Sequence, residues 1–222
     1  MMTLRLMQAV VATVSEQWES PLADEVLQRW DHNGDSAKFW RASTNFVFFF
    51  KQAGQDCVLR FNHADERTLS AMQGEIDFVN GLATQGIPVA KPIRSRNGHY
   101  VESVATALGT FYATAFEALQ GEQWEVEDLT PQQFVAWGQA LGALHNASAK
   151  LTVAGRPTWQ DHLAMAAALI PAQETAAHQT LEMLRQQLHQ LPVNAENFGL
   201  IHYDFELDNL IWDGETAGII DF

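Results

Sequence analysis

Hydrophobic positions recur along the chain with two spacings, and each spacing predicts a different kind of element. In 3–18 and again in 66–85, apolar residues lie three or four positions apart, which is typical of one buried face of a helix. A shorter helix is expected over 21–30, where a proline begins the stretch. The runs 46–50 and 57–61 consist largely of aromatic and β-branched residues, which favour strands. The N-terminal part therefore predicts two helices, a strand hairpin and a longer helix.

The middle of the chain predicts further strands and then a helical region. Asn97-Gly98 is a strong turn signal, and we expect a hairpin of strands over 94–104. Thr130 and the proline after it have the chemistry of a helix start, with a threonine cap and a proline in the first turn. A further strand is expected over 110–116, and further helices are expected over 130–150, 160–169 and 174–191.

The last stretch of the chain, 200–222, places polar residues at the ends of short apolar runs. Three strands are expected, separated by a polar loop and by an Asp-Gly turn, over 200–202, 210–212 and 217–221. Asp204 and Asn209 lie in the loop, and Asp221 closes the third run. We therefore expect a carboxylate, an amide oxygen and a second carboxylate to meet in one small fold.

These three polar residues have the chemistry that phosphoryl transfer requires. A hydroxyl that attacks a phosphoryl group needs an acceptor for its proton, and Asp204 is the candidate. Magnesium prefers oxygen ligands, and Asn209 and Asp221 are the candidates for holding it. Ordinary loop carboxylates are the alternative, against which the spacing and the strand context argue together. His202 is expected to hold the loop by hydrogen bonding rather than to act as an acid or a base.

The order of these residues resembles the catalytic loop and metal-binding segment of the protein-kinase-like superfamily. The closest match is the aminoglycoside phosphotransferase and choline kinase family, through His202-Tyr203-Asp204-Phe205, Asp208-Asn209-Leu210 and Ile219-Ile220-Asp221-Phe222. The resemblance implies an α+β, two-lobed fold, with an N-terminal antiparallel sheet and one main helix, and a mostly helical C-terminal lobe lacking its last helices. It divides the chain into a nucleotide-binding lobe, 1–116, and a hinge with a partial catalytic lobe, 117–222.

The resemblance also implies which residue holds the phosphates of a nucleotide. Arg60 occupies the position of the family's basic strand residue, although a solvated charge on a half-exposed strand is the alternative. Glu75, on the helix expected over 66–85, is the expected ion-pair partner of Arg60, with Glu66 and Asp77 as the other candidates.

Two further segments correspond to nucleotide-binding segments of the family. The segment Arg41-Ala42-Ser43-Thr44-Asn45 lies where the family has its phosphate-covering loop. Ser43, Thr44 and Asn45 are expected to cover the phosphates with hydroxyl and amide groups, an ordinary turn being the alternative. Backbone groups of Phe116 and Ala118, in the expected hinge, are expected to hold adenine.

The composition and net charge of the chain indicate which kinds of binding partner and which cellular location to expect. With 222 residues, 47% of them hydrophobic, the chain is long and apolar enough to bury a core. A net charge of −14 argues against a nucleic-acid partner and permits a cationic substrate, although many chains are acidic for solubility alone. We see no membrane-spanning run or leader, so we expect no membrane partner and a cytoplasmic location. The single cysteine, Cys57, is expected in the core.

The family resemblance stops at Phe222, at the end of an apolar run. Members of the family continue with helices that complete the acceptor pocket. We therefore expect a truncated chain, an incomplete reading frame or a partner that supplies the missing surface. An uncovered C-terminal lobe would expose apolar surface and self-associate.

The resemblance implies an enzyme, a small-molecule kinase that uses ATP and magnesium to move the γ-phosphate to the hydroxyl of a small-molecule acceptor. An aminoglycoside, choline or another amino alcohol, homoserine and a sugar-like compound all stay open as acceptors. One alternative is a non-catalytic nucleotide-binding scaffold or a truncated inactive homologue. Another is a metal-dependent phosphohydrolase built on His202, Asp204 and Asp221, which would need more metal ligands than the sequence offers.

Overall fold

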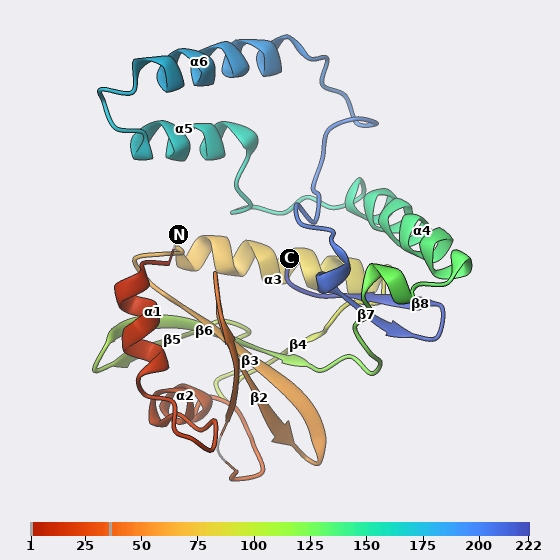
Figure 1. The fold of residues 1–222 in the computed structure, drawn as a ribbon. Coiled ribbons are helices and arrows are strands. Elements are labelled where there is room, and N and C mark those ends of the chain that lie inside the picture. Colours follow the sequence, from red (N-terminus) through yellow and green to blue (C-terminus); the bar gives the residue numbers. More distant parts are fainter. Residues whose placement is uncertain (1, 36) are drawn as a thin grey trace.

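A six-stranded antiparallel sheet forms the N-terminal half of the protein (Figure 1). The computed structural model describes residues 2–35 and 37–222. The strand order is β1-β2-β3-β6-β4, and β5 also pairs with β6. The strands are β1 (Lys38–Ala42), β2 (Phe46–Gln52), β3 (Gln55–His63), β4 (Pro92–Ile93), β5 (Glu102–Thr106) and β6 (Gly109–Glu117).

Helices pack against this sheet, and aromatic residues fill its core. The N-terminal helices α1 (Leu4–Val11) and α2 (Pro21–Leu27) bury Val10 and Val26 against the strands. Four phenylalanine rings from β2, β3 and β6 lie in contact and contribute much of this core, namely Phe46, Phe48, Phe61 and Phe111. Burying large aromatic side chains is strongly stabilising, so this part of the sheet is a firm support for residues on its other face.

The long helix α3 (Leu69–Thr84) joins the sheet to the C-terminal part of the protein. Met72 and Ile76 pack with Phe116 of β6, whereas Phe78 and Leu82 pack with helix α4 (Pro131–Ser148) and with the C-terminal hairpin. That hairpin consists of β7 (Leu210–Asp213) and β8 (Thr216–Ile219). Short 3-10 turns lie at Val126–Asp128 and Leu207–Asn209.

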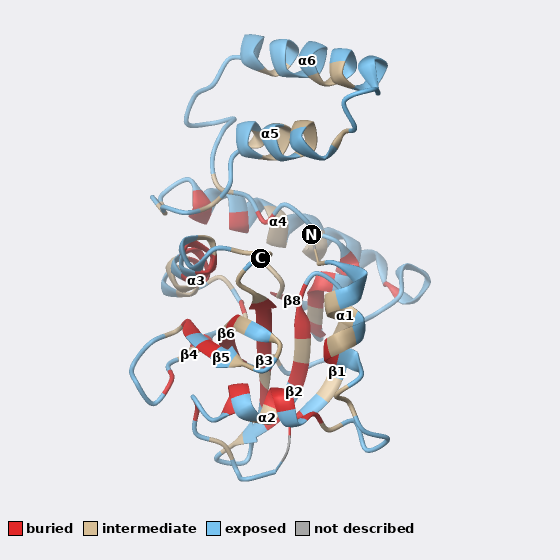
Figure 2. Cartoon of the chain, turned by 90° about the vertical axis from the view of Figure 1, so that its left-hand side faces the viewer, coloured by how far each residue is buried: buried red, intermediate tan, exposed pale blue. Residues whose placement is uncertain are grey.

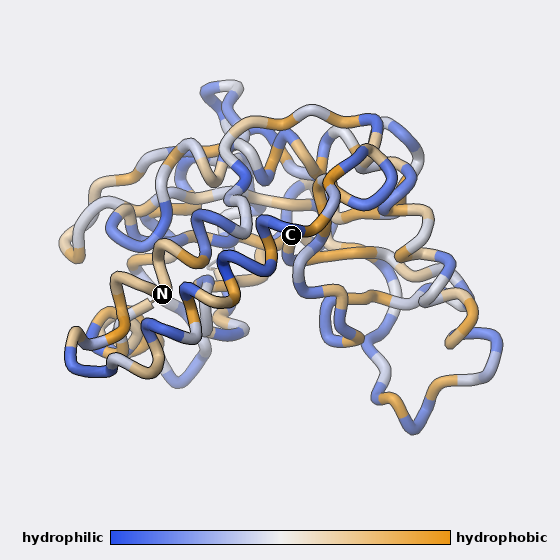
Figure 3. The backbone as a smooth tube through the Cα atoms, turned by 90° about the horizontal axis from the view of Figure 1, so that it is seen from above, coloured by the Kyte–Doolittle hydropathy of each residue, from blue (hydrophilic) through white to orange (hydrophobic). Residues whose placement is uncertain are grey.

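Helices α5 (Trp159–Leu169) and α6 (Thr175–Gln190) form a pair that stands away from both cores (Figures 1 and 2). Neither helix has a buried residue, and the two helices contact each other. Trp159 and His189 meet edge to face with ring centroids 4.9 Å apart. Along the chain as a whole, hydrophobic and hydrophilic stretches alternate, as amphipathic elements require (Figure 3).

The sequence pattern located most elements correctly, and the start of α4 is the clearest case. Thr130 accepts a hydrogen bond from the backbone N–H of Gln133, and the Gln133 side chain accepts one from the backbone N–H of Thr130. This capping box satisfies backbone donors that a helix start otherwise leaves unpaired. The expected α+β arrangement, with an antiparallel N-terminal sheet and one main helix, agrees with the structure.

Three local predictions were wrong. The first helix does not extend to Trp18 but ends at Val11, because the Thr13 hydroxyl donates to the Val10 carbonyl at 2.7 Å and lies 2.6 Å from the Ser20 hydroxyl. The expected hairpin over 94–104 has its Asn-Gly turn, but its two strands do not pair with each other. Both β4 and β5 pair with β6, which is the longer strand and offers partners to both.

The third error concerns Leu200 to His202, which form no strand. The C-terminal sheet consists of β7 and β8 alone. The His202 side chain, rather than its backbone, connects this segment to the hairpin, so three residues without a backbone partner stay irregular.

The division into lobes stays a proposal, with boundaries at 1–116 and 117–222. The second core includes Phe78 and Leu82 of α3, so this helix contributes to both parts. Within the part of the chain that the structure describes, no helix is long and apolar enough to cross a membrane. Cys57 lies in the core, 2% exposed, as expected, and burial raises the pKa of its thiol.

Candidate active site

The expected catalytic loop brings Asp204 and Asn209 into contact. The amide nitrogen of Asn209 donates to the backbone carbonyl of Asp204 at 2.9 Å and lies 3.4 Å from its carboxylate oxygen Oδ2. Asn209 is buried in the turn Leu207–Asn209, whereas Asp204 is exposed. With its nitrogen bonded to Asp204, the amide oxygen of Asn209 is the atom that a cation can use.

This loop is tied to Asp221 through the backbone of the preceding residue. The N–H of Ile220 donates to the Asn209 carbonyl at 3.0 Å. The carbonyl of Ile220 lies 2.8 Å from Nε2 of His202, and because a carbonyl only accepts, Nε2 carries the hydrogen. Burial lowers the pKa of His202 and favours its neutral form. His202 therefore holds the loop by hydrogen bonding, as the sequence predicted.

Two residues of this region have left-handed backbone conformations that side chains disfavour. Tyr203 has φ +82° and Asp221 has φ +61°. Such conformations cost free energy in residues with a Cβ and cluster at functional sites. In this protein they lie directly beside Asp204 and at the expected metal ligand.

Arg60 of β3 lies at the centre of the ion pairs in the site. It pairs with Glu75 of α3 through Nη2, and its Nη1 donates to Oδ1 of Asp221 at 2.9 Å. Its guanidinium also lies 5.1 Å from the ring centroid of Phe116. Burial lowers the pKa of Arg60, and the Asp221 carboxylate opposes that shift. A buried cation therefore has two carboxylate partners, one from α3 and one from the segment that follows β8.

The structure also resolves the choice among carboxylates for Arg60. Glu75 is 1% exposed and makes the ion pair. Glu66 accepts from the N–H of Thr3, and Asp77 accepts from the Gln73 side chain. The prediction that Glu75 is the partner is therefore confirmed as a contact.

The sequence interpretation missed Arg67, which also contacts Glu75. Its Nη2 lies 2.6 Å from Oε2 of Glu75, and burial together with repulsion from Arg60 lowers the pKa of Arg67 to about 10. The only signal in the sequence was a second basic residue directly before Thr68, the cap of α3, and such residues are usually solvated.

Of the loop residues, Asn45 alone has its side chain in the site. It is 5% exposed, and its Nδ2 donates to Oδ1 of Asp221 at 3.0 Å. Ser43 and Thr44 are exposed and do not line the cavity. The backbone carbonyl of Thr44 accepts from the buried Asn62 side chain at 2.6 Å, which fixes the turn.

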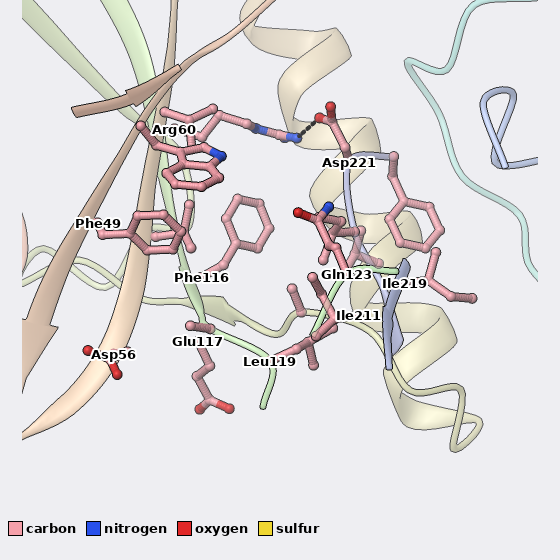
Figure 4. Close-up of a pocket in the computed structure, with 18 of the residues that line it drawn as sticks. Phe49, Asp56, Arg60, Phe116, Glu117, Leu119, Gln123, Ile211, Ile219 and Asp221 are labelled. Carbon is pink, nitrogen blue, oxygen red and sulfur yellow. Dashed lines mark hydrogen bonds and ion pairs between the residues drawn. The ribbon is translucent and has the colours of Figure 1, made fainter. Parts of the chain in front are cut away.

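A cavity of about 580 Å³ lies between the sheet, α3 and the C-terminal hairpin. Figure 4 shows Arg60 and Asp221 at one end of it and Glu117 and Leu119 at the other. The first end is formed by charged side chains, and the second by the apolar side chains of Leu119 and Ile211, by the exposed Glu117 carboxylate and by the chain that links the two lobes. A cavity of this size and polarity suits a ligand with an anionic group and an apolar ring.

Phe116 and Ala118 both line this cavity, but the N–H of Ala118 is already bonded. It donates to the Asp56 carbonyl at 3.0 Å. The carbonyl of Ala118 and the N–H of Leu119 have no hydrogen-bond partner among residues 2–35 and 37–222. These two groups, rather than the Ala118 N–H, are therefore available to the edge of a ring.

The linking chain is held against β7 at Gly121. Glu122 and Trp212 exchange backbone hydrogen bonds of 3.0 and 2.8 Å. Gly121 has φ +128°, and a Cβ at this position would overlap the Trp212 carbonyl. Glycine is therefore required both by conformation and by space.

Sequence comparison gives the family. Residues 37–222 match the model of the phosphotransferase enzyme family. The chain belongs to this family. This confirms the resemblance found in the sequence.

Relatives of this phosphotransferase family member include two named kinases. Amicoumacin kinase of Bacillus subtilis (strain 168) is 26% identical over 210 residues, covering 92% of this chain and 62% of that protein. Homoserine kinase of Methylobacillus flagellatus is 26% identical over 164 residues, covering 71% of this chain and 49% of that kinase. The chain therefore spans about half to two thirds of the length of these relatives.

Solved structures confirm the fold of this family member. The amicoumacin kinase hAmiN superposes with a TM-score of 0.81 at 24% identity, covering 96% of this chain and 65% of the other. A microcompartment-associated aminopropanol kinase gives 0.71 at 23% identity, covering 90% of this chain and 68% of the other. The predicted two-lobed kinase-like fold is thus confirmed.

The oxygen donors of this phosphotransferase family member fit a magnesium ion. A carboxylate from Asp221 and the amide oxygen of Asn209 are hard ligands, and magnesium takes few protein ligands when phosphates are present. No group of three or more His, Cys, Asp or Glu side chains in the described part of the chain could hold a metal.

Proposed function

We propose that this protein is an ATP- and magnesium-dependent phosphotransferase that moves the γ-phosphate to a hydroxyl of a small molecule. One observation carries the proposal. The buried Arg60–Glu75 pair reaches Asp221 at the charged end of the cavity, and Asp221 is tied through Ile220 to the Asp204–Asn209 loop. Proton acceptor, metal ligands and phosphate-binding cation thus belong to one connected site.

Each group has one role in this proposal. The adenine ring lies at the apolar end of the cavity, with its edge at the Ala118 carbonyl and the Leu119 N–H. Arg60 binds the phosphates, and Glu75 orients Arg60. Asn209 and Asp221 would hold magnesium, which neutralises charge on the phosphates when bound. Support comes from hAmiN, whose structure is described as a complex with AMP-PNP and Ca2+.

Asp204 accepts the proton of the acceptor hydroxyl. The hydroxyl oxygen forms a bond to the γ-phosphorus, the bond from that phosphorus to the bridging oxygen breaks, and ADP leaves with the electron pair. The hydrogen bond from Asn209 holds Asp204 in position for this step. Because Asp204 is exposed, an acceptor can reach it from solvent.

We propose an amino alcohol as the acceptor class. Relatives and structural neighbours are named for amicoumacin, homoserine and aminopropanol, and the net charge of −14 suits an acceptor with a cationic amine. A cytoplasmic location, where ATP and magnesium are supplied, accompanies this proposal. Self-association stays a prediction.

The first test is a thermal-shift titration of the 222-residue chain with magnesium-ATP. We expect a magnesium-dependent rise in the melting temperature that Asp221→Ala removes and that Asp213→Ala, at the hairpin turn, retains. A folded wild-type chain without any shift would contradict the proposal.

A transfer assay with a panel of amino alcohols and aminoglycosides then separates the enzyme from the scaffold. Binding of ATP without transfer to any acceptor would favour the scaffold. Formation of ADP together with a phosphorylated acceptor would support the proposal.

A further inference from the structure

Arg41 of β1 contacts the carboxylate oxygen of Asp221 that Arg60 does not contact. Its Nη2 lies 3.1 Å from Oδ2 of Asp221, whereas Arg60 and Asn45 both donate to Oδ1. The expected metal ligand therefore accepts three hydrogen bonds from the N-terminal lobe. Both of its oxygens therefore accept hydrogen bonds from protein groups.

A bulge in β1 directs Arg41 into the cavity. Phe39 pairs with Phe48 and Arg41 pairs with Val47, so Trp40 is an extra residue between two regular pairs. In an unbroken strand, neighbouring side chains point to opposite faces, yet Trp40 and Arg41 both line the cavity. A bulge re-aims side chains in this way and is frequent beside active sites.

The register of the sheet places Arg41 and Arg60 as a pair of cations. Arg41 lies opposite Val47, and Val47 lies opposite Arg60, so the two arginines are two strands apart, about 10 Å between backbones. Both guanidinium groups nevertheless converge on Asp221. Burial is the main cause that lowers the pKa of Arg60, and repulsion between the like charges of Arg41 and Arg60 lowers it further.

Four arginines lie at or just behind this end of the cavity, where Glu75 and Asp221 are the paired carboxylates, although the whole chain carries −14. Arg67 and Arg156 add to the positive potential at Arg60, and Arg156 has no ion pair within the described residues. The ion pairs at this end involve Asp221 and Glu75 alone. A local excess of cations attracts a polyanion, and a chain of phosphates has that charge.

We propose that Arg41 is a second phosphate-binding residue that pairs with Asp221 only until a nucleotide arrives. The inference rests on the proposed function. When magnesium and a triphosphate bind, the Arg41 guanidinium moves from Asp221 to the terminal phosphates and leaves the carboxylate to the metal. Arg41 thereby supplies the charge that a glycine-rich loop would otherwise provide through backbone N–H groups.

Exposure explains why Arg41, rather than Arg60, is the group that moves. The Arg60 side chain is 7% exposed and is held by Glu75, whereas the Arg41 side chain is 41% exposed and has Asp221 as its one ion-pair partner among the described residues. A long, half-exposed side chain reorients at small cost. Arg60 therefore stays as the fixed phosphate contact, and Arg41 adds a movable one.

The alternative is that Arg41 only blocks Asp221, and the two possibilities predict opposite effects. If Arg41 binds phosphate, Arg41→Gln weakens binding of a magnesium-bound, non-hydrolysable ATP analogue about tenfold, because a charge-assisted hydrogen bond is lost. Adenosine, which has no phosphate, binds this variant as it binds the wild type. If Arg41 only blocks the site, its removal leaves triphosphate binding unchanged or makes it tighter.

The experiment is calorimetric titration of both ligands into wild type, Arg41→Gln, Arg41→Lys and Arg96→Gln. Arg96 forms a surface ion pair with Asp31 and is the matched control, with wild-type affinity expected for both ligands. Arg41→Lys keeps the positive charge but lacks the paired N–H donors of a guanidinium group, so it should lose less affinity for the triphosphate than Arg41→Gln. If Arg41→Gln does not fold, the triphosphate affinity of Arg41→Lys is used instead to test whether Arg41 binds phosphate. Melting temperatures of the free variants check folding.

The outcomes separate this inference from the proposed function. Wild type that binds the triphosphate, together with an Arg41→Gln variant that binds it equally or more tightly, overturns the role of Arg41 and leaves the phosphotransferase proposal standing. Folded wild type that binds neither ligand overturns both. A loss confined to the triphosphate in the Arg41 variants, absent in Arg96→Gln, supports the inference.

Discussion

Arg67 donates a hydrogen bond from Nη2 to Oε2 of Glu75 at 2.6 Å, while Arg60 pairs with the other oxygen of the same carboxylate. Glu75 therefore neutralises two guanidinium groups inside the protein, with only 1% of its own surface exposed. The carboxylate fixes α3 to the strand that contains Arg60. Arg67 is thus a positioning residue, which acts on the phosphate site through Glu75.

Glu75→Gln should strongly destabilise the fold. It leaves the buried Arg60 and the partly buried Arg67 without their shared carboxylate, and breaking a buried pair costs about 3–5 kcal/mol. Urea unfolding followed by circular dichroism measures the change. Glu182→Gln, which removes a surface carboxylate of α6, is the control and should leave the unfolding midpoint unchanged. Equal midpoints for both variants would show that Glu75 does not anchor the site.

Asp204→Asn should lower the transfer rate by about 100-fold or more, because the amide cannot accept the hydroxyl proton. Nucleotide affinity should stay near the wild-type value, since Asp204 contacts Asn209 rather than the phosphate-binding cations. Single-turnover kinetics and a binding titration give the two quantities separately. Asp208→Asn, an exposed residue of the same loop, is the control and should transfer normally. A fully active Asp204→Asn variant would refute the assignment of the loop.

The stability of the protein should fall in mild acid because of His202. Its pKa is lowered in the fold, so below about pH 6.5 the unfolded chain takes up a proton that the folded protein resists. The free energy of unfolding therefore decreases as the pH falls through this window and stops decreasing below the folded pKa. Urea unfolding at a series of pH values measures the slope.

His202→Gln separates this effect from other acid-sensitive groups. Glutamine keeps a nitrogen donor for the Ile220 carbonyl but does not titrate. The decrease in the free energy of unfolding that His202 causes in mild acid should therefore disappear in this variant. If His202→Gln and wild type lose stability in parallel, the histidine is not responsible.

Gly121→Ala should disrupt the junction between the linking chain and β7. The φ of +128° disfavours any Cβ, and the added methyl group would overlap the Trp212 carbonyl, so we expect a loss of about 3 kcal/mol. Gly214→Ala isolates the first effect, since Gly214 also has positive φ but has open space around it, and should cost about 1 kcal/mol. Thermal unfolding compares the two. Similar melting temperatures for the two variants would mean that the close approach of Gly121 to the Trp212 carbonyl does not add to the cost of a Cβ.

Much of the candidate site could be predicted because its residues lie close together in sequence or in a fixed motif. The loop from Asp204 to Asn209 closes on itself, and a contact over five positions depends on local geometry. The Arg60–Glu75 contact was also expected, but only through the family resemblance. Arg67 was missed, and Arg41 was placed in the expected phosphate-covering segment without its contact to Asp221, because a basic residue gives no sequence signal of which carboxylate it will meet.

The sequence by itself determined the elements whose causes are local. The Thr130 cap starts α4, runs of aromatic and β-branched residues form β2 and β3, and the Asp213-Gly214 turn joins β7 to β8. Each depends on neighbours a few positions apart, through side-chain hydrogen bonds, periodic burial or backbone preference. Such preferences act before any distant part of the chain is in place.

Only the tertiary structure decided the contacts between distant segments. β4 and β5 both pair with β6 rather than with each other, and a bulge at Trp40 turns Arg41 toward Asp221, 180 positions away. Strand pairing is a competition among all available edges, and an ion pair across a cavity forms only after both walls have packed. These outcomes depend on the whole fold, so the sequence pattern near each residue could not reveal them.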